Sequence, residues 1–382
     1  MPTVALLSTA LLAAFRPAVR SRAGPISLIE KPDPFSALGG ALARVSETSD
    51  ESKSWVREGN SWLLLPQATP WACIHFVGGA GFGSAPQICY DALLSSLVQR
   101  LGVAVVATPY DIATDHWSLS RKVHQDFDAA RSALQERYGL GVAAPTYRLG
   151  HSLGGKLLTL GSLGDAAAAE VFGALPAGTI DVTEPLPPPP PPAPPGAPLG
   201  LLAFNNFALA DSAALASNFL SRLQGGETAR TAETAKAVMD AFSMAQAFAT
   251  AAGADFAANL EVSPTPAELE RAVGERYAAA DTRVWQFRGD ALDSSDGLLG
   301  SLPPEARVER VVLNAAPGHL TPVVFSLEAA DIDPTLALLL GSNRAFSFGD
   351  EDALAQLCDA LCDWVWPSGM AMPTTRALAQ GE

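Results

Sequence analysis

Charged residues are scarce in this chain, and cysteines are scarcer still. Only 17% of its 382 residues are charged, and 40 acidic residues outnumber 25 lysines and arginines, for a formal net charge of -15. Such an acidic protein repels phosphate backbones, so nucleic-acid binding is not expected. Four cysteines are too few for a disulfide scaffold. Cys358 and Cys362 lie four residues apart with no histidine nearby, which favours apolar packing on one helix face over a metal site, and no cofactor is expected.

Long hydrophobic runs are also missing. Apolar residues make up 48% of the chain, which is enough for a sizeable core and excludes wholesale disorder. Beyond the N-terminal region the apolar runs are short or interrupted by charges, so no transmembrane helix is predicted. The length exceeds what one core usually serves, which indicates a large domain with insertions, or two domains.

The N-terminal region has the composition of a targeting leader. An apolar run at 4–15 is too short to span a bilayer, and an arginine- and serine-containing stretch without acidic residues follows it up to Glu30. The Ala-Phe-Arg-Pro junction at 14–17 is similar to the one in plastid proteins of algae. We therefore expect residues 1–29 to be a leader to the plastid (chloroplast), with the secretory pathway and the mitochondrion as alternatives.

Short apolar runs alternate with helical patterns along the rest of the chain. A hairpin is predicted over 55–65, and helical patterns occur at 86–101, around 126–137 and at 352–366. Strands are predicted at 72–77, 103–107, 147–149, 199–204, 283–287 and 307–313, and the first two are expected to be buried. Alternation of strands and helices predicts a mostly parallel, doubly wound α/β sheet in one domain over 50–382.

Two stretches interrupt this alternation. Ten prolines lie between Pro185 and Pro198, and we expect a disordered, solvated insertion over 164–198. The second stretch, 208–280, is rich in alanine and in other helix formers. It lies between two late strands of the predicted sheet, so we expect a helical cap over the strand ends.

A Gly-His-Ser-Leu-Gly sequence at 150–154 carries the predicted chemistry. A strand pattern precedes it and a helix-forming run follows it. Glycines two residues on either side of Ser152 let a strand and a helix approach closely at a strained turn, which exposes the serine hydroxyl. The pattern is typical of a nucleophilic serine.

A serine nucleophile needs a base and an orienting acid. His319 is the only histidine after Ser152, and it follows the strand predicted at 307–313. Asp290 follows the preceding strand, which gives the chain order serine, acid, histidine. Asp293 is an alternative acid, because loop geometry alone decides between the two.

Backbone N–H groups are expected to complete the site as an oxyanion hole. Leu153 follows the nucleophile, and Gly79 or Ala80 lies in the glycine-rich loop after the strand at 72–77. Further residues at the same sheet edge are candidates for lining the pocket or for stabilising loops: Tyr110, His116, Asn205 and Asn206.

Five short motifs occur together in this chain, at 75–80, 108–110, 150–154, 204–207 and 318–322. Their combination resembles domain of unknown function 1350, an uncharacterised family of the α/β-hydrolase superfamily found in plants, algae and cyanobacteria. The resemblance implies an α/β-hydrolase fold and, for eukaryotic members, a plastid setting, but no known substrate. The polyproline segment departs from the family pattern.

Two functions follow as hypotheses. The first is a serine hydrolase acting on an ester or thioester of an apolar acyl group, with a small-molecule acyl substrate or a lipid as its partner. The second is a non-catalytic protein of the same fold that binds a lipid or pigment, or scaffolds a plastid assembly. Rapid turnover that is lost in a folded Ser152→Ala variant would exclude the second hypothesis.

Overall fold

The computed structural model describes part of the chain, namely residues 40, 42, 44, 45, 54–163, 197–206, 262–279, 281–314, 318–328 and 345–366. The chain divides into two compact units, Met1–Pro32 and Asp33–Glu382, and every described residue lies in the second. The expected leader, nearly all of the expected proline-rich insertion and most of the expected cap lie outside the described residues.

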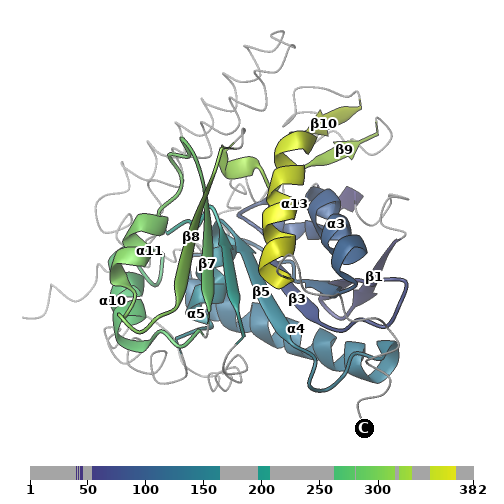
Figure 1. The fold of residues 1–382 in the computed structure, drawn as a ribbon, viewed down its shortest axis with the longest axis horizontal. Coiled ribbons are helices and arrows are strands. Elements are labelled where there is room, and N and C mark those ends of the chain that lie inside the picture. The colour runs from purple at the N-terminus through teal and green to yellow at the C-terminus, as the bar shows by residue number, and fades with distance from the viewer. Residues whose placement is uncertain are drawn as a thin grey trace, which may run out of the picture. The chain divides into compact units, whose positions relative to one another are not determined.

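An eight-stranded sheet forms the centre of the described part (Figure 1). Its strands follow the spatial order β1-β2-β4-β3-β5-β6-β7-β8. Their bounds are β1 Trp55–Glu58, β2 Ser61–Leu64, β3 Cys73–Val77, β4 Ala104–Ala107, β5 Thr146–His151, β6 Leu199–Leu202, β7 Thr282–Phe287 and β8 Val308–Leu313. Each predicted strand therefore appears, within a few residues of its expected limits.

The sheet is mostly parallel. The β1–β2 hairpin and the β2–β4 pair are antiparallel, whereas all pairs from β4 across to β8 are parallel. Parallel strands bring their carboxyl ends to one edge, where active sites of open α/β sheets form. A mostly parallel sheet of this order, with a serine-bearing turn after β5, has the α/β-hydrolase fold. The expected fold class is confirmed.

Helices cover both faces of the sheet (Figure 1). On one face α3 and α13 pack together over a core that includes Ile74, Phe76 and Trp285. On the other face α4, α5, α10 and α11 pack over the alternate side chains of the same strands. The bounds are α2 Pro86–Cys89, α3 Asp91–Leu101, α4 His116–Tyr138, α5 Leu153–Leu160, α10 Pro266–Arg276, α11 Ser295–Ser301 and α13 Glu351–Val365.

Three features differ from the sequence prediction. The helix expected over 86–101 is broken into α2 and α3 at Tyr90, whose backbone is not helical. Helix α4 begins at His116, well before the expected position, because the Asp115 carboxylate accepts the Ser118 N–H and caps it. A hairpin of β9 (Phe325–Leu327) and β10 (Phe346–Phe348) was not predicted, because three-residue strands leave little periodicity to read.

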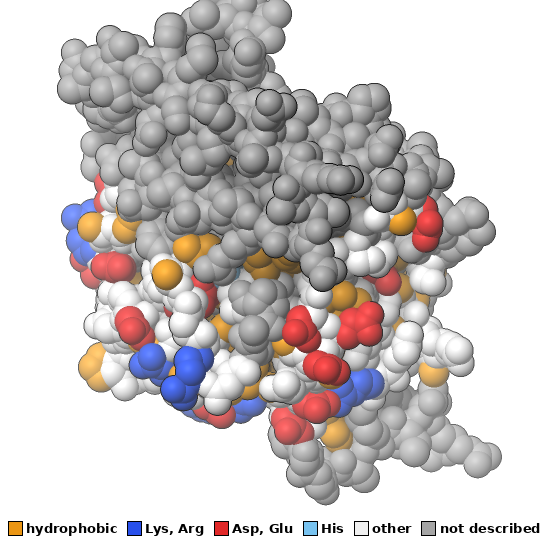
Figure 2. Space-filling model, turned by 90° about the horizontal axis from the view of Figure 1, so that it is seen from above, with side chains coloured by type: hydrophobic (Ala, Val, Ile, Leu, Met, Phe, Trp, Pro, Cys, Tyr) orange, Lys and Arg blue, Asp and Glu red, His pale blue; other side chains and the backbone are white. Residues whose placement is uncertain are grey.

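On the face seen in Figure 2, acidic side chains lie beside basic ones. Several charged side chains form ion pairs, such as Arg100 with Asp359 and Lys122 with Asp126. Exposed pairs of this kind contribute little to stability. No helix among the described residues is long and apolar enough to cross a membrane.

Candidate active site

The turn between β5 and α5 holds Ser152 in a strained backbone conformation. Its φ of 55° and ψ of -122° lie in a region that residues other than glycine rarely adopt. Within the described residues only one other non-glycine residue, Ala203, has a positive φ. Ser152 is 8% exposed and lies at the carboxyl edge of the sheet, as expected for a nucleophile elbow.

The glycines around Ser152 are required by close backbone packing. An alanine Cβ at Gly154 would lie 2.1 Å from the Val77 carbonyl oxygen, on β3. A Cβ at Gly150 would lie 2.6 Å from the Cα of Gly155. Both distances are shorter than van der Waals contact, so a larger residue would push α5 away from the sheet and move Ser152.

The structure brings Ser152, His319 and Asp290 together. The Ser152 Oγ is 2.9 Å from His319 Nε2, and His319 Nδ1 is 2.9 Å from Asp290 Oδ2. The Asp290 side chain is 1% exposed and that of His319 is 10% exposed. A buried carboxylate beside Nδ1 keeps the proton on that nitrogen, so Nε2 is free to accept the serine proton.

The two candidate acids occupy different environments. Asp290 accepts the Leu292 N–H with Oδ1 and faces His319 with Oδ2. Asp293 instead accepts the Gln286 amide at 3.1 Å and the Ser295 N–H at 2.7 Å, both with Oδ1. Burial raises the pKa of Asp293. Of the two acids, only Asp290 is hydrogen-bonded to the histidine in the described part of the chain.

The loop after β3 lies against the elbow. A Cβ at Gly79 would be 3.1 Å from the Ser152 Cβ, so the loop backbone is in contact with the nucleophile. The Gly79 N–H, however, donates to the Tyr90 hydroxyl at 2.8 Å and is not free for a substrate oxygen. Among the described residues no hydrogen bond engages the N–H of Ala80 or of Leu153. The geometry therefore corrects the expectation for Gly79 and leaves Ala80 and Leu153 as available donors.

The four expected pocket residues make bonds that hold loops in place. Tyr110 is buried and its hydroxyl donates to the Gly78 carbonyl at 2.9 Å. The Asn205 side chain donates to the Leu292 carbonyl at 3.3 Å, and the Asn206 side chain donates to the Pro266 carbonyl at 3.2 Å.

His116 is the fourth of these residues. Its backbone N–H donates to the Ser263 carbonyl at 2.7 Å, and burial lowers its side-chain pKa to about 3, with a smaller effect from Lys156. The side chains of Tyr110, Asn205 and Asn206 therefore have structural partners, whereas the bond described for His116 is that of its backbone.

Two residues at the site have no role in the sequence prediction. The Tyr90 hydroxyl is 2.8 Å from His151 Nδ1, and His151 Nε2 is 2.8 Å from the His319 carbonyl oxygen. The position of His151 inside the serine motif was the only feature of the sequence that could have indicated its role at the site. Tyr90 lies in the middle of a helical pattern, and nothing in its neighbourhood along the chain indicates a contact with the serine loop.

Lys156 lies one turn into α5 and is almost completely buried, at 1% exposure. Its Nζ donates to the Pro264 carbonyl at 2.9 Å. Burial lowers its pKa to about 7, with Glu268 opposing that change. No group of three or more metal-ligating side chains gathers among the described residues.

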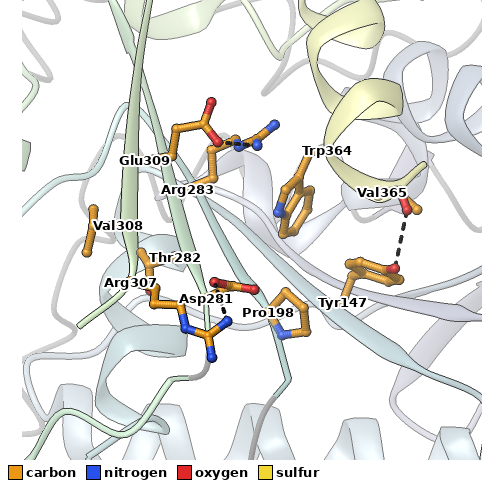
Figure 3. Close-up of a pocket in the computed structure, with 10 residues that line it drawn as sticks. All are labelled: Tyr147, Pro198, Asp281, Thr282, Arg283, Arg307, Val308, Glu309, Trp364 and Val365. Carbon is orange, nitrogen blue, oxygen red and sulfur yellow. Dashed lines mark hydrogen bonds and ion pairs between the residues drawn. The ribbon is translucent and has the colours of Figure 1, made fainter. Parts of the chain in front are cut away.

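A cavity of about 420 Å³ opens at the other edge of the sheet (Figure 3). Its lining comes from the amino ends of β5 to β8 and the end of α13: Tyr147, Pro198, Asp281, Thr282, Arg283, Arg307, Val308, Glu309, Trp364 and Val365. Arg283 pairs with Glu309, and Arg307 pairs with Asp281 (Figure 3). The cavity is separate from the edge that bears Ser152, and its charged groups are already paired.

Comparison with known families finds a match to the family described as "Protein of unknown function (DUF1350)" over residues 54–176. The resemblance to that family is confirmed. The matched segment includes the glycine-rich loop and the serine motif, and it ends before the motifs at 204–207 and 318–322. No curated protein matches the chain.

Several solved structures to which this chain is similar are described as lipases or as an alpha/beta hydrolase domain-containing protein. A hormone-sensitive lipase from a metagenome library is 14% identical with a TM-score of 0.41, and 88% of this chain and 92% of that chain are covered. A soluble variant of monoglyceride lipase from Saccharomyces cerevisiae is 9% identical with a TM-score of 0.39, and 83% of this chain and 95% of that chain are covered. Alpha/beta hydrolase domain-containing protein 10 from mouse is 12% identical with a TM-score of 0.35, and 82% of this chain and 97% of that chain are covered. The fold class rests on the strand order and the serine-bearing turn after β5.

Proposed function

We propose that this protein is a serine hydrolase that cleaves an ester or thioester of an apolar acyl group. The observation that carries the proposal is the continuous arrangement of Ser152 Oγ, the His319 ring and the Asp290 carboxylate, with 2.9 Å at each step. Three side chains that are far apart in the sequence rarely meet at these distances in this order without a catalytic role.

The chemistry follows from these positions. Ser152 Oγ attacks the acyl carbonyl carbon while His319 Nε2 takes the serine proton. Asp290 keeps the ring oriented and stabilises the imidazolium. The N–H groups of Ala80 and Leu153 donate to the oxyanion of the tetrahedral intermediate. His319 then gives the proton to the leaving alcohol or thiol, and a water molecule, activated by the same histidine, releases the acid from the acyl-enzyme.

Labelling with a fluorophosphonate probe tests this proposal. The probe phosphonylates an activated serine, so wild-type protein should form one adduct, on Ser152. His319→Ala should lower the labelling rate by at least about 10³-fold, since it removes the base. The matched control is Ser132→Ala, an exposed serine of α4, which should label like the wild type. A well-folded wild-type protein that forms no adduct and turns over no acyl ester would refute the proposal and favour a non-catalytic, ligand-binding protein.

The plastid location is a further part of this proposal, and it is carried by the composition of residues 1–29. Fusion of this segment to a fluorescent protein in an algal cell tests it. The fusion should accumulate in the plastid, whereas secretion or mitochondrial import would support one of the alternatives.

A further inference from the structure

A buried path of hydrogen bonds runs behind Ser152 and joins two loops of the site. The Gly79 N–H donates to the Tyr90 hydroxyl at 2.8 Å, and that hydroxyl lies 2.8 Å from His151 Nδ1. His151 Nε2 lies 2.8 Å from the backbone carbonyl oxygen of His319. Tyr90 is fully buried and His151 is 1% exposed, so water does not compete for these bonds.

The direction of every bond along the path is determined. A carbonyl oxygen only accepts, so His151 Nε2 must carry a proton and donate it to His319. Burial lowers the pKa of His151 to about 3, so the ring is neutral and Nδ1 is an acceptor. Tyr90 therefore donates its single proton to Nδ1, and its oxygen accepts the Gly79 N–H. Burial also raises the pKa of Tyr90, which keeps the phenol protonated.

Each end of the hydrogen-bond path lies beside a group that takes part in the proposed reaction. At one end, Gly79 is one residue before Ala80, and the adjoining carbonyls are bonded as well. Gly78 accepts from Tyr110, and Gly79 accepts from the Gly83 N–H at 2.6 Å. The Gly79 carbonyl and the Ala80 N–H belong to one peptide group, so the bond from Gly83 and the restraint of the preceding peptide give the Ala80 N–H a defined direction.

At the other end, the bonded carbonyl belongs to the same residue as the catalytic imidazole. It lies in a short 3-10 helix, η3 (Gly318–Leu320). In the described part of the chain the bond to His151 is the only one that joins the backbone of this helix to another element, while the His319 ring is bonded to Ser152 and Asp290. His151 itself is adjacent to Ser152. A shift of His151 would therefore move the His319 base and the Ser152 nucleophile relative to each other.

We propose that Tyr90 and His151 are positioning residues that hold the Ala80 oxyanion donor and the His319 base in register with Ser152. This inference rests on the proposed function, because it assigns these residues a purpose in the same reaction. Neither side chain touches the reacting atoms. Both act through backbone groups, namely the Gly79 N–H and the His319 carbonyl.

Tyr90→Phe tests the inference, since it removes one oxygen and keeps the ring that packs against Phe76. The control is Tyr147→Phe, which removes a hydroxyl bonded to the Val365 carbonyl at the opposite sheet edge. With p-nitrophenyl butyrate, we expect kcat of Tyr90→Phe to fall about 10- to 100-fold with KM within about twofold, because misplacement acts on the transition state. The affinity for an alkylboronic acid, which mimics the tetrahedral intermediate, should fall in parallel. Tyr147→Phe should match the wild type.

A second pair of variants keeps the test decisive if Tyr90→Phe fails to fold. His151→Gln retains a donor and an acceptor on the side chain, whereas His151→Leu retains neither. We expect kcat of His151→Gln to be at least about tenfold higher than kcat of His151→Leu. Equal losses in the two variants, unchanged kcat in Tyr90→Phe, or a loss confined to KM with unchanged boronate affinity would each overturn the inference.

A measurement that needs no turnover separates this inference from the proposed function. Nitrogen-15 NMR of the five imidazoles in the full chain should include the signals of a neutral ring protonated at Nε2 that vanish in His151→Gln, which assigns them to His151. The Nδ1 resonance of that ring should shift in Tyr90→Phe and stay in place in Tyr147→Phe. A wild-type protein that fails to label with fluorophosphonate but shows this pattern would refute the hydrolase proposal and leave the hydrogen-bond path in place. A His151 ring protonated at Nδ1 would refute the hydrogen-bond path.

Discussion

Lys156 is a buried cation with one hydrogen bond, and its replacement gives a quantitative prediction. Its Nζ contacts the Pro264 carbonyl, and burial lowers its pKa from 10.5 to about 7. The charged and titratable groups around it are Glu268 and His116. The change in pKa corresponds to a cost of about 5 kcal/mol for burying the charged form. Lys156→Met removes this cost while keeping an unbranched side chain of similar length.

The sign of the pH dependence follows from proton binding. Between pH 7 and 10.5 the unfolded lysine is protonated and the folded lysine is mostly neutral, so the unfolded state binds more protons. The wild-type free energy of unfolding should therefore rise through this window relative to Lys156→Met, by about 1.4 kcal/mol per pH unit at most. Below pH 7 both states of the wild type are protonated, and the difference between the two proteins should be constant.

Urea unfolding followed by tryptophan fluorescence, at pH values from 6 to 10, measures this difference. In Lys156→Met the Pro264 carbonyl loses its buried hydrogen-bond partner, which changes the free energy of unfolding by about 1–3 kcal/mol at every pH. The test is therefore the slope of the difference in free energy against pH, and not its absolute value. Lys122→Met is the control, because Lys122 is 56% exposed and pairs with Asp126 on the surface of α4. A difference curve for Lys156→Met as flat as that for Lys122→Met would refute the reasoning.

Three further predictions concern the site and its stability. Asp290→Asn should lower kcat by about 10⁴-fold, whereas Asp293→Asn should retain activity within tenfold, and ester hydrolysis by the two folded variants compares them. Gly154→Ala should abolish Ser152 labelling and lower the urea midpoint, because its Cβ would collide with β3; unchanged labelling would contradict the packing. Acidification from pH 6.5 to 4 should lower the free energy of unfolding, because histidines that the fold keeps neutral become protonated on unfolding; a thermal midpoint constant over this range would contradict their burial. The histidines concerned are His75, His116, His124 and His151.

Much of the fold could be predicted from the chain because its signals are local. The short apolar runs at 72–77 and 103–107 form the fully buried strands β3 and β4. The other strands predicted for the central sheet are present as well, and β8 at its edge is partly exposed. The serine turn also has a local signal, because the glycines that its close packing requires, Gly150 and Gly154, lie two residues on either side of Ser152. The chain order of serine, acid and histidine follows from the same topology.

Contacts between distant segments were decided by the tertiary structure alone. Asp290 and Asp293 lie three residues apart in one loop, and only the path of that loop shows which carboxylate meets His319. Whether Gly79 or Ala80 offers a free N–H depends on Tyr90, which reaches the loop from outside it.

Tyr90 is the clearest case. A helical pattern continues through it in the sequence, but the helix breaks there and the hydroxyl meets His151, 61 residues away along the chain. No periodicity or spacing in the sequence indicates a contact between two side chains that are so far apart along the chain. The residues of the reaction are therefore encoded in short motifs, and the bonds that hold them in position arise only when the sheet and its loops come together.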